Sequence, residues 1–116
     1  MNPKAVSRER ARAVLAGEAF STFWEWIDQA RAKFGRGRID GIAANAQRCL
    51  EAALAGIEDW LDAVYNQGMD PEEADFYFLG DSDACTGLGH SAPSQIIDRK
   101  LGVFADWSPE MMRDQA

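Results

Sequence analysis

The feature that most constrains this chain is a stripe of apolar residues that runs from Ile39 to Tyr65. Its members recur at steps of three and four residues, which keeps them on one side of a helix. They are Ile39, Ile42, Ala43, Ala46, Cys49, Leu50, Ala53, Leu54, Ile57, Trp60, Leu61 and Val64. At about 1.5 Å per residue, such a helix is long enough to cross a small domain. We therefore predict one long central helix over 39–66, against which the other helices pack.

Shorter helices are predicted on both sides of this central helix. The first covers 4–16 and stops at Gly17, and the second carries an aromatic stripe that we expect to be buried. That stripe consists of Phe20, Phe23, Trp24, Ile27, Ala30 and Phe34. Asp70 followed by Pro71 predicts a helix start. We favour a helix over 71–79 to a strand over 75–79, because one strand alone would have no partner.

The remaining segments complete an all-α prediction. Residues 80–91 are dense in turn formers and are expected to form a loop, followed by a helix over 92–101. A last short helix is expected after Ser108, with Met111 and Met112. A chain of 116 residues with 47% hydrophobic residues is long enough for one core. We expect residues 1–116 to form a single helical domain, a bundle of about five helices around the central one.

Charge is distributed unevenly along the chain. Residues 1–50 contain nine Lys or Arg and five acids, whereas residues 51–116 contain three Lys or Arg and fourteen acids. This division indicates an acidic outer face, or a dipolar molecule that pairs with itself or with a partner. The alternative is that two solvated faces of opposite sign touch each other inside one fold.

The segment 80–91 is the one candidate for a chemical site, since Asp81, Asp83, Cys85 and His90 are all potential metal ligands. A calcium loop would need a further carboxylate and a bidentate Glu, and a zinc site would need two more Cys or His ligands. Acidic neighbours disfavour a reactive thiol. A helix-turn-helix over 84–103 would have too few cations for DNA. We therefore expect no enzyme activity, catalytic residue, cofactor or metal.

The dense acidic half is the positive signal for function. Ordered carboxylates on a rigid helical frame can occupy a basic or nucleic-acid-binding site on another protein. The candidate partner-binding residues are Glu51, Glu58, Asp59, Asp62, Glu72, Glu73, Asp75, Asp81, Asp83 and the off-stripe Trp26. In size, acidity and lack of catalytic motifs, the chain resembles small inhibitors of the anti-CRISPR type carried by phages and mobile elements. The resemblance covers general character and no motif, and it implies binding to a CRISPR effector or nuclease subunit.

Other functional classes remain open. The basic segments Lys4–Arg12 and Arg31–Arg38 would suit a small DNA-binding regulator, although we do not expect direct nucleic-acid binding. A structural or accessory subunit is a further alternative. A homodimer is another alternative, because the chain has more apolar surface than one small core absorbs. The residues that contribute this surface are Trp26, Tyr65, Trp107, Met111 and Met112. No secretory signal or membrane span is evident, and we expect a cytoplasmic protein without a membrane partner.

Overall fold

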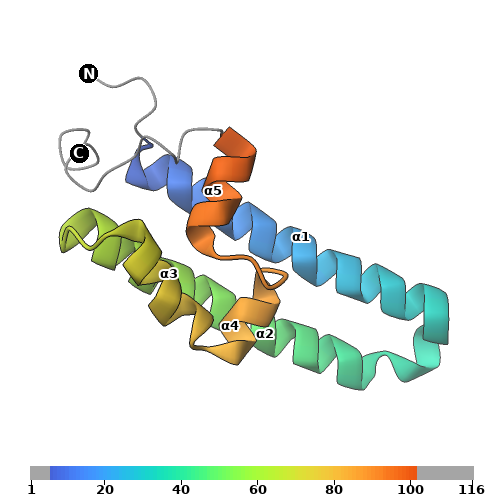
Figure 1. Ribbon diagram of the computed structural model, residues 1–116. Coiled ribbons are helices and arrows are strands. Elements are labelled where there is room, and N and C mark those ends of the chain that lie inside the picture. Colours follow the sequence, from blue (N-terminus) through green and yellow to red (C-terminus); the bar gives the residue numbers. More distant parts are fainter. Residues whose placement is uncertain (1–5, 102–116) are drawn as a thin grey trace.

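The computed structural model describes residues 6–101, except for the side chain of Arg38 (Figure 1). In chain order its helices are α1 (Arg8–Phe34), α2 (Asp40–Leu61), α3 (Pro71–Leu79), α4 (Ser82–Gly87) and α5 (Pro93–Leu101). A 3₁₀ turn over Arg36–Arg38 joins α1 to α2, and a π-helical turn over Asp62–Asn66 follows α2. The described part contains no strand, which confirms the all-α class and the helix over 71–79. The helix predicted after Ser108 lies outside the described residues.

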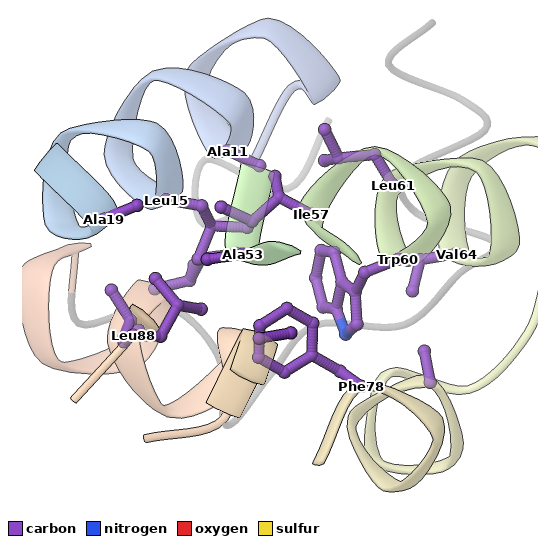
Figure 2. Close-up of a cluster of buried hydrophobic side chains, with 14 of the residues drawn as sticks. Ala11, Leu15, Ala19, Ala53, Ile57, Trp60, Leu61, Val64, Phe78 and Leu88 are labelled. Carbon is purple, nitrogen blue, oxygen red and sulfur yellow. The ribbon is translucent and has the colours of Figure 1, made fainter. Parts of the chain in front are cut away.

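α1 and α2 form an antiparallel hairpin, and the three shorter helices cover only part of it. Figure 1 shows α5 over α1, and α3 and α4 over α2, all away from the turn that joins the two long helices. The core lies where these layers meet, and Figure 2 shows part of it. Its fully buried side chains include Trp60, Leu15, Ile57, Leu61, Leu88, Ile96, Ile97 and Val64. Within the described range, no helix has both the length and the apolar composition needed to cross a membrane.

α2 confirms the apolar stripe that organises the sequence. Its buried residues are Ala46, Cys49, Ala53, Ile57, Trp60 and Leu61. The helix predicted over 39–66 changes pitch near its end, where the N–H of Gln67 bonds to the carbonyl of Asp62 at 3.1 Å. Two consecutive side chains in this turn, Val64 and Tyr65, are both buried.

Tyr65 ties the end of α2 to the segment before α1. Its hydroxyl donates a hydrogen bond to the carbonyl of Val6 at 2.9 Å, and burial raises the pKa of the phenol. We expect Tyr65→Phe to lower the free energy of unfolding by about 1–2 kcal/mol, because the buried carbonyl loses this donor. Urea denaturation measures the loss. Tyr77→Phe is the control and should leave stability unchanged, since the Tyr77 ring is 65% exposed. Equal stability of the two variants would contradict the buried hydrogen bond.

The break predicted at Gly17 is wrong, because α1 runs through it from Arg8 to Phe34. The helix ends at Gly35, which has φ of 70°. A glycine in a helix interior costs about 1 kcal/mol relative to alanine. On either side of it, however, Leu15 and Ala19 are fully buried. The packing of these neighbours therefore outweighs the poor helix propensity of one residue.

The aromatic stripe of α1 is not buried as a whole, which corrects a second prediction. Phe20, Trp24 and Phe34 have exposed fractions of 47%, 53% and 43%. Many buried positions of the hairpin are instead alanines: Ala11, Ala19, Ala30, Ala46 and Ala53. Alanines let the two helices approach closely, so large rings beside them are displaced to the flanks of the contact. The hairpin end that carries Phe34 also extends beyond α3, α4 and α5 (Figure 1).

α3 and α5 begin close to their predicted positions, and each has a proline as its first residue. The carboxylate of Asp70 accepts a hydrogen bond from the N–H of Glu72 at 3.1 Å, and Pro71 occupies the first turn. α5 has Pro93 at its start and includes Leu101, in agreement with the predicted range.

A short helix occupies part of the segment 80–91, which was predicted to be a loop. The carboxylate of Asp81 caps α4 by accepting hydrogen bonds from the N–H groups of Asp83 at 3.0 Å and Ala84 at 3.2 Å. The last residue of α4, Gly87, packs directly on the backbone of α2, where a Cβ would lie 2.3 Å from the carbonyl oxygen of Cys49. This tertiary contact supports a helix that is too short to be stable through local propensity alone.

Candidate functional site

A groove of about 330 Å³ opens between α2, α3 and α4. Its lining consists of Gly56, Asp59, Trp60, Ala63, Met69, Ala74, Tyr77, Phe78, Asp81 and Ala84. Trp60 and Phe78 are buried, whereas the Tyr77 ring is 65% exposed. The volume lies within the range of ligand pockets, and the lining is mainly apolar and aromatic. We refer to this site as the acidic groove, because its two charged residues, Asp59 and Asp81, are both carboxylates.

Gly56 gives the groove its shape. A Cβ at this position would lie 2.8 Å from Cε2 of Phe78 and 3.5 Å from Cβ of Ala84. The glycine inside α2 therefore permits close contact from a crossing helix. Figure 2 shows the Phe78 ring of α3 and the Trp60 ring of α2, which together form the buried part of the groove wall.

Asp75 holds the groove together from inside and is not part of the surface. Its Oδ1 accepts hydrogen bonds from Trp60 Nε1 at 2.9 Å and from the Ser94 N–H at 3.1 Å, and its Oδ2 accepts one from the Ser94 hydroxyl. Burial raises the pKa of Asp75, and these three hydrogen bonds oppose that rise. The assignment of Asp75 to a partner-binding face is therefore corrected: only 7% exposed, it connects α2, α3 and α5.

Carboxylates stand at the edge of the groove. Asp59 is exposed, and its side chain has no hydrogen bond or ion pair with any other described residue. Asp81 also lines the groove, while one of its oxygens caps α4. Glu73 is exposed and lies one helical turn before Tyr77, so both side chains project from the same side of α3. Two of the predicted partner-binding acids, Asp59 and Asp81, thus line the groove, and Glu73 lies on the same side of α3 as the lining residue Tyr77.

Two other predicted acids pair with arginines of the basic half. Glu58 accepts hydrogen bonds from Nε and Nη2 of Arg12, both at 2.8 Å, and this contact lowers the pKa of Glu58. Asp83 lies 3.5 Å from Nε of Arg48. The carboxylates of α2 and α4 therefore do not form one continuous acidic face. Opposite charges partly neutralise each other within the fold, as the alternative interpretation of the charge pattern expected.

The remaining predicted residues lie outside the groove. The carboxylate of Asp62 accepts hydrogen bonds from the Asn66 and Gln67 side chains at 2.6 and 2.7 Å, which lowers the pKa of Asp62. Glu51 accepts one from Gln47 at 3.4 Å, and Glu72 is exposed in the first turn of α3. Trp26 is half-buried and lines a shallow hollow between α1 and α2.

The potential ligands of 80–91 have separate surroundings. The Sγ of Cys85 lies 3.8 Å from Nδ1 of His90, but neither side chain lines the acidic groove. Asp81 caps α4 and Asp83 faces Arg48. Within residues 6–101, no three His, Cys, Asp or Glu side chains come together in a group that could hold a metal ion.

The acidic groove combines apolar and aromatic walls with carboxylates at its edge. No protein-family model, curated protein or solved structure matches this chain. Aromatic walls can hold an apolar side chain or the face of a guanidinium, and carboxylates at the edge attract Lys or Arg. The sequence predicted acidic residues as partner-binding residues but did not predict the aromatic side chains of the groove. The run Phe76–Phe78 has the composition of an ordinary buried segment. Its composition contained no signal that Tyr77 would be exposed.

Proposed function

We propose that the protein is a non-enzymatic, cytoplasmic binding protein that uses the acidic groove to hold a basic, partly apolar segment of a protein partner. One observation carries this proposal: Asp59, which has no side-chain partner among the described residues, stands at an apolar groove beside the exposed Tyr77 ring. An exposed aromatic side chain next to a carboxylate is well suited to a protein interface.

The apolar walls and the carboxylates of the groove contribute to binding in different ways. Covering the apolar walls of the groove supplies affinity, at about 25 cal/mol for each Å² of apolar surface removed from water. The carboxylates orient cationic side chains and disfavour acidic competitors. A net charge of −7 also accelerates encounter with basic surfaces.

Occupying a basic surface of a partner would exclude nucleic acid from it. This is the mode of action that the resemblance to anti-CRISPR inhibitors implies. A CRISPR effector or nuclease subunit is therefore the first class of partner to test.

Direct DNA binding through the basic half has less support. Arg8–Arg12 and Arg31–Lys33 lie toward opposite ends of α1, roughly 30 Å apart at the rise of an α-helix. Arg12 and Arg48 also face carboxylates of the same chain. Binding to duplex DNA ordinarily requires several cations gathered on one surface.

The proposal is tested by identifying the partner and then altering the groove. Affinity purification of the tagged chain from its native host identifies the partner, and the affinity is measured with purified components. We expect Asp59→Lys and Tyr77→Ser each to weaken binding about tenfold or more, because they remove the charge or the aromatic wall.

Glu51→Lys is the matched control, since it makes the same charge change on α2 outside the groove. We expect it to change the affinity by less than about threefold. Undiminished binding by Asp59→Lys and Tyr77→Ser would contradict the proposal. A gel-mobility shift of random duplex DNA by the chain alone at low salt would also contradict the proposal. That result would favour the alternative function of a small DNA-binding regulator.

A further inference from the structure

The side of α1 that faces away from α2 and α5 has no covering element among the described residues (Figure 1). Seven residues recur there at steps of three and four, and every one of them is exposed. They are Arg10, Ala13, Gly17, Phe20, Ser21, Trp24 and Asp28, and we call them the outer face of α1. A soluble monomer rarely leaves two neighbouring large rings half-exposed without a use for them.

The centre of this face combines small residues with large rings. Ala13, Gly17 and Ser21 follow one another at intervals of four residues, and a Cβ at Gly17 would meet nothing within 4 Å. Phe20 and Trp24 stand beside them, 47% and 53% exposed. Small residues let a second helix approach closely, and the rings of that helix can fill the space above them. The face therefore has both the projections and the hollows of a helix–helix contact.

Charge decides what kind of helix fits. Neither the Arg10 nor the Asp28 side chain has an ion-pair partner among residues 6–101. Arg10 lies nine residues before position 19 and Asp28 lies nine residues after it. Position 19 itself lies between Gly17 and Ser21. An antiparallel second copy of α1 centred at that position would place each Arg10 against the Asp28 of the other copy. A symmetric dimer requires a surface that is complementary to itself, and this face meets the requirement.

We propose that two copies of this chain associate through the outer face of α1, with the two helices antiparallel and centred near position 19. α1 contains five basic and four acidic residues, so contact through it keeps the strongly acidic halves of the two copies apart. α1 lines no part of the acidic groove, so this association is independent of the proposed function and would give the assembly two grooves.

Charge reversal tests the contact and its direction. Arg10→Glu and Asp28→Arg are each expected to raise the dimer dissociation constant about tenfold or more, because each creates two like-charge pairs per dimer. The double variant restores both pairs and should return to near the original dissociation constant. Within one chain the two residues are roughly 27 Å apart along α1, so rescue requires contact between copies. Sedimentation equilibrium of the full chain over a concentration series gives the dissociation constants.

A steric variant separates association from folding. Gly17→Lys should abolish the dimer without lowering stability, because the position is open in the monomer and lysine is the better helix former. Gly37→Lys, at an equally open position in the turn between α1 and α2, should leave the dimer intact. A monomeric mass for the original chain at every concentration would overturn the proposal. Failure of the double charge variant to recover dimerisation would overturn the antiparallel arrangement.

Two further results would assign the face to a different occupant and would also overturn the proposal. In the first, the chain is a monomer and Trp24→Arg lowers its unfolding free energy, which means that other residues of the same chain cover the face. In the second, the monomer binds the identified protein partner and Gly17→Lys abolishes that binding.

Discussion

Replacing Gly87 with alanine is expected to lower the free energy of unfolding by about 3 kcal/mol. An added Cβ would lie 2.3 Å from the carbonyl oxygen of Cys49 and 2.7 Å from Cβ of Ala53. Both atoms belong to or adjoin the backbone of α2, so neither can move aside as the end of a flexible side chain would. Overpacking of this kind costs about 1–3 kcal/mol even where partial relaxation is available. α4 would have to separate from α2.

The sign of this effect is opposite to the one that helix propensity predicts. Alanine is about 1 kcal/mol more favourable than glycine in a helix, so Gly87→Ala would stabilise α4 if the helix were free of α2. Gly41→Ala is the control, because a Cβ at that position in α2 meets nothing within 4 Å. Chemical denaturation should show a stability gain or no change for Gly41→Ala and a large loss for Gly87→Ala. A gain for both would show that α4 does not pack on α2 as described.

Removing the Asp75 carboxylate is expected to have a similar cost. Asp75→Ala takes away the acceptor of three buried hydrogen bonds, from Trp60 Nε1, the Ser94 N–H and the Ser94 hydroxyl. Each buried donor that loses its partner costs about 1–3 kcal/mol, and the missing side-chain atoms leave a cavity. We expect a total loss of about 3–5 kcal/mol in the free energy of unfolding. Because the residue connects α2, α3 and α5, the acidic groove should lose its shape as well.

Asp75→Asn separates hydrogen bonding from charge. The amide oxygen can still accept from Trp60 and the Ser94 N–H, and the amide NH₂ can donate to the Ser94 hydroxyl. Burial raises the pKa of Asp75 in the folded state, so its contribution to stability is fully present below the unfolded value of about 3.9. The contribution is lost as pH rises through the raised, folded-state pKa. Urea denaturation at several pH values should therefore show the asparagine variant gaining stability relative to the original chain as pH increases from 4 to about 7. A constant difference would contradict a buried carboxylate.

The acidic groove was only partly predictable from the sequence. Asp59 and Asp81 could be named in advance because carboxylates in the later half of the chain are visible in composition alone. Asp75 belonged to the same acidic run, yet it is buried and hydrogen-bonded to Ser94, 19 residues further along the chain. No local signal distinguishes a solvated aspartate from a buried one. The difference depends on which distant donors the fold brings to it.

Local information determined the parts of this protein that depend on neighbours in the chain. The apolar period of α2, the Asp70–Pro71 start of α3 and the Gly35 end of α1 follow from side-chain spacing and capping, which act within a few residues. Tertiary structure alone decided the rest. α1 continues through Gly17 because buried residues on both sides hold it, and α4 exists because Gly87 fits against α2. Tertiary structure also decided which apolar side chains are exposed, among them Phe20, Trp24 and Tyr77. The sequence specifies how much apolar surface a chain has, whereas the burial of a side chain requires another element to lie against it.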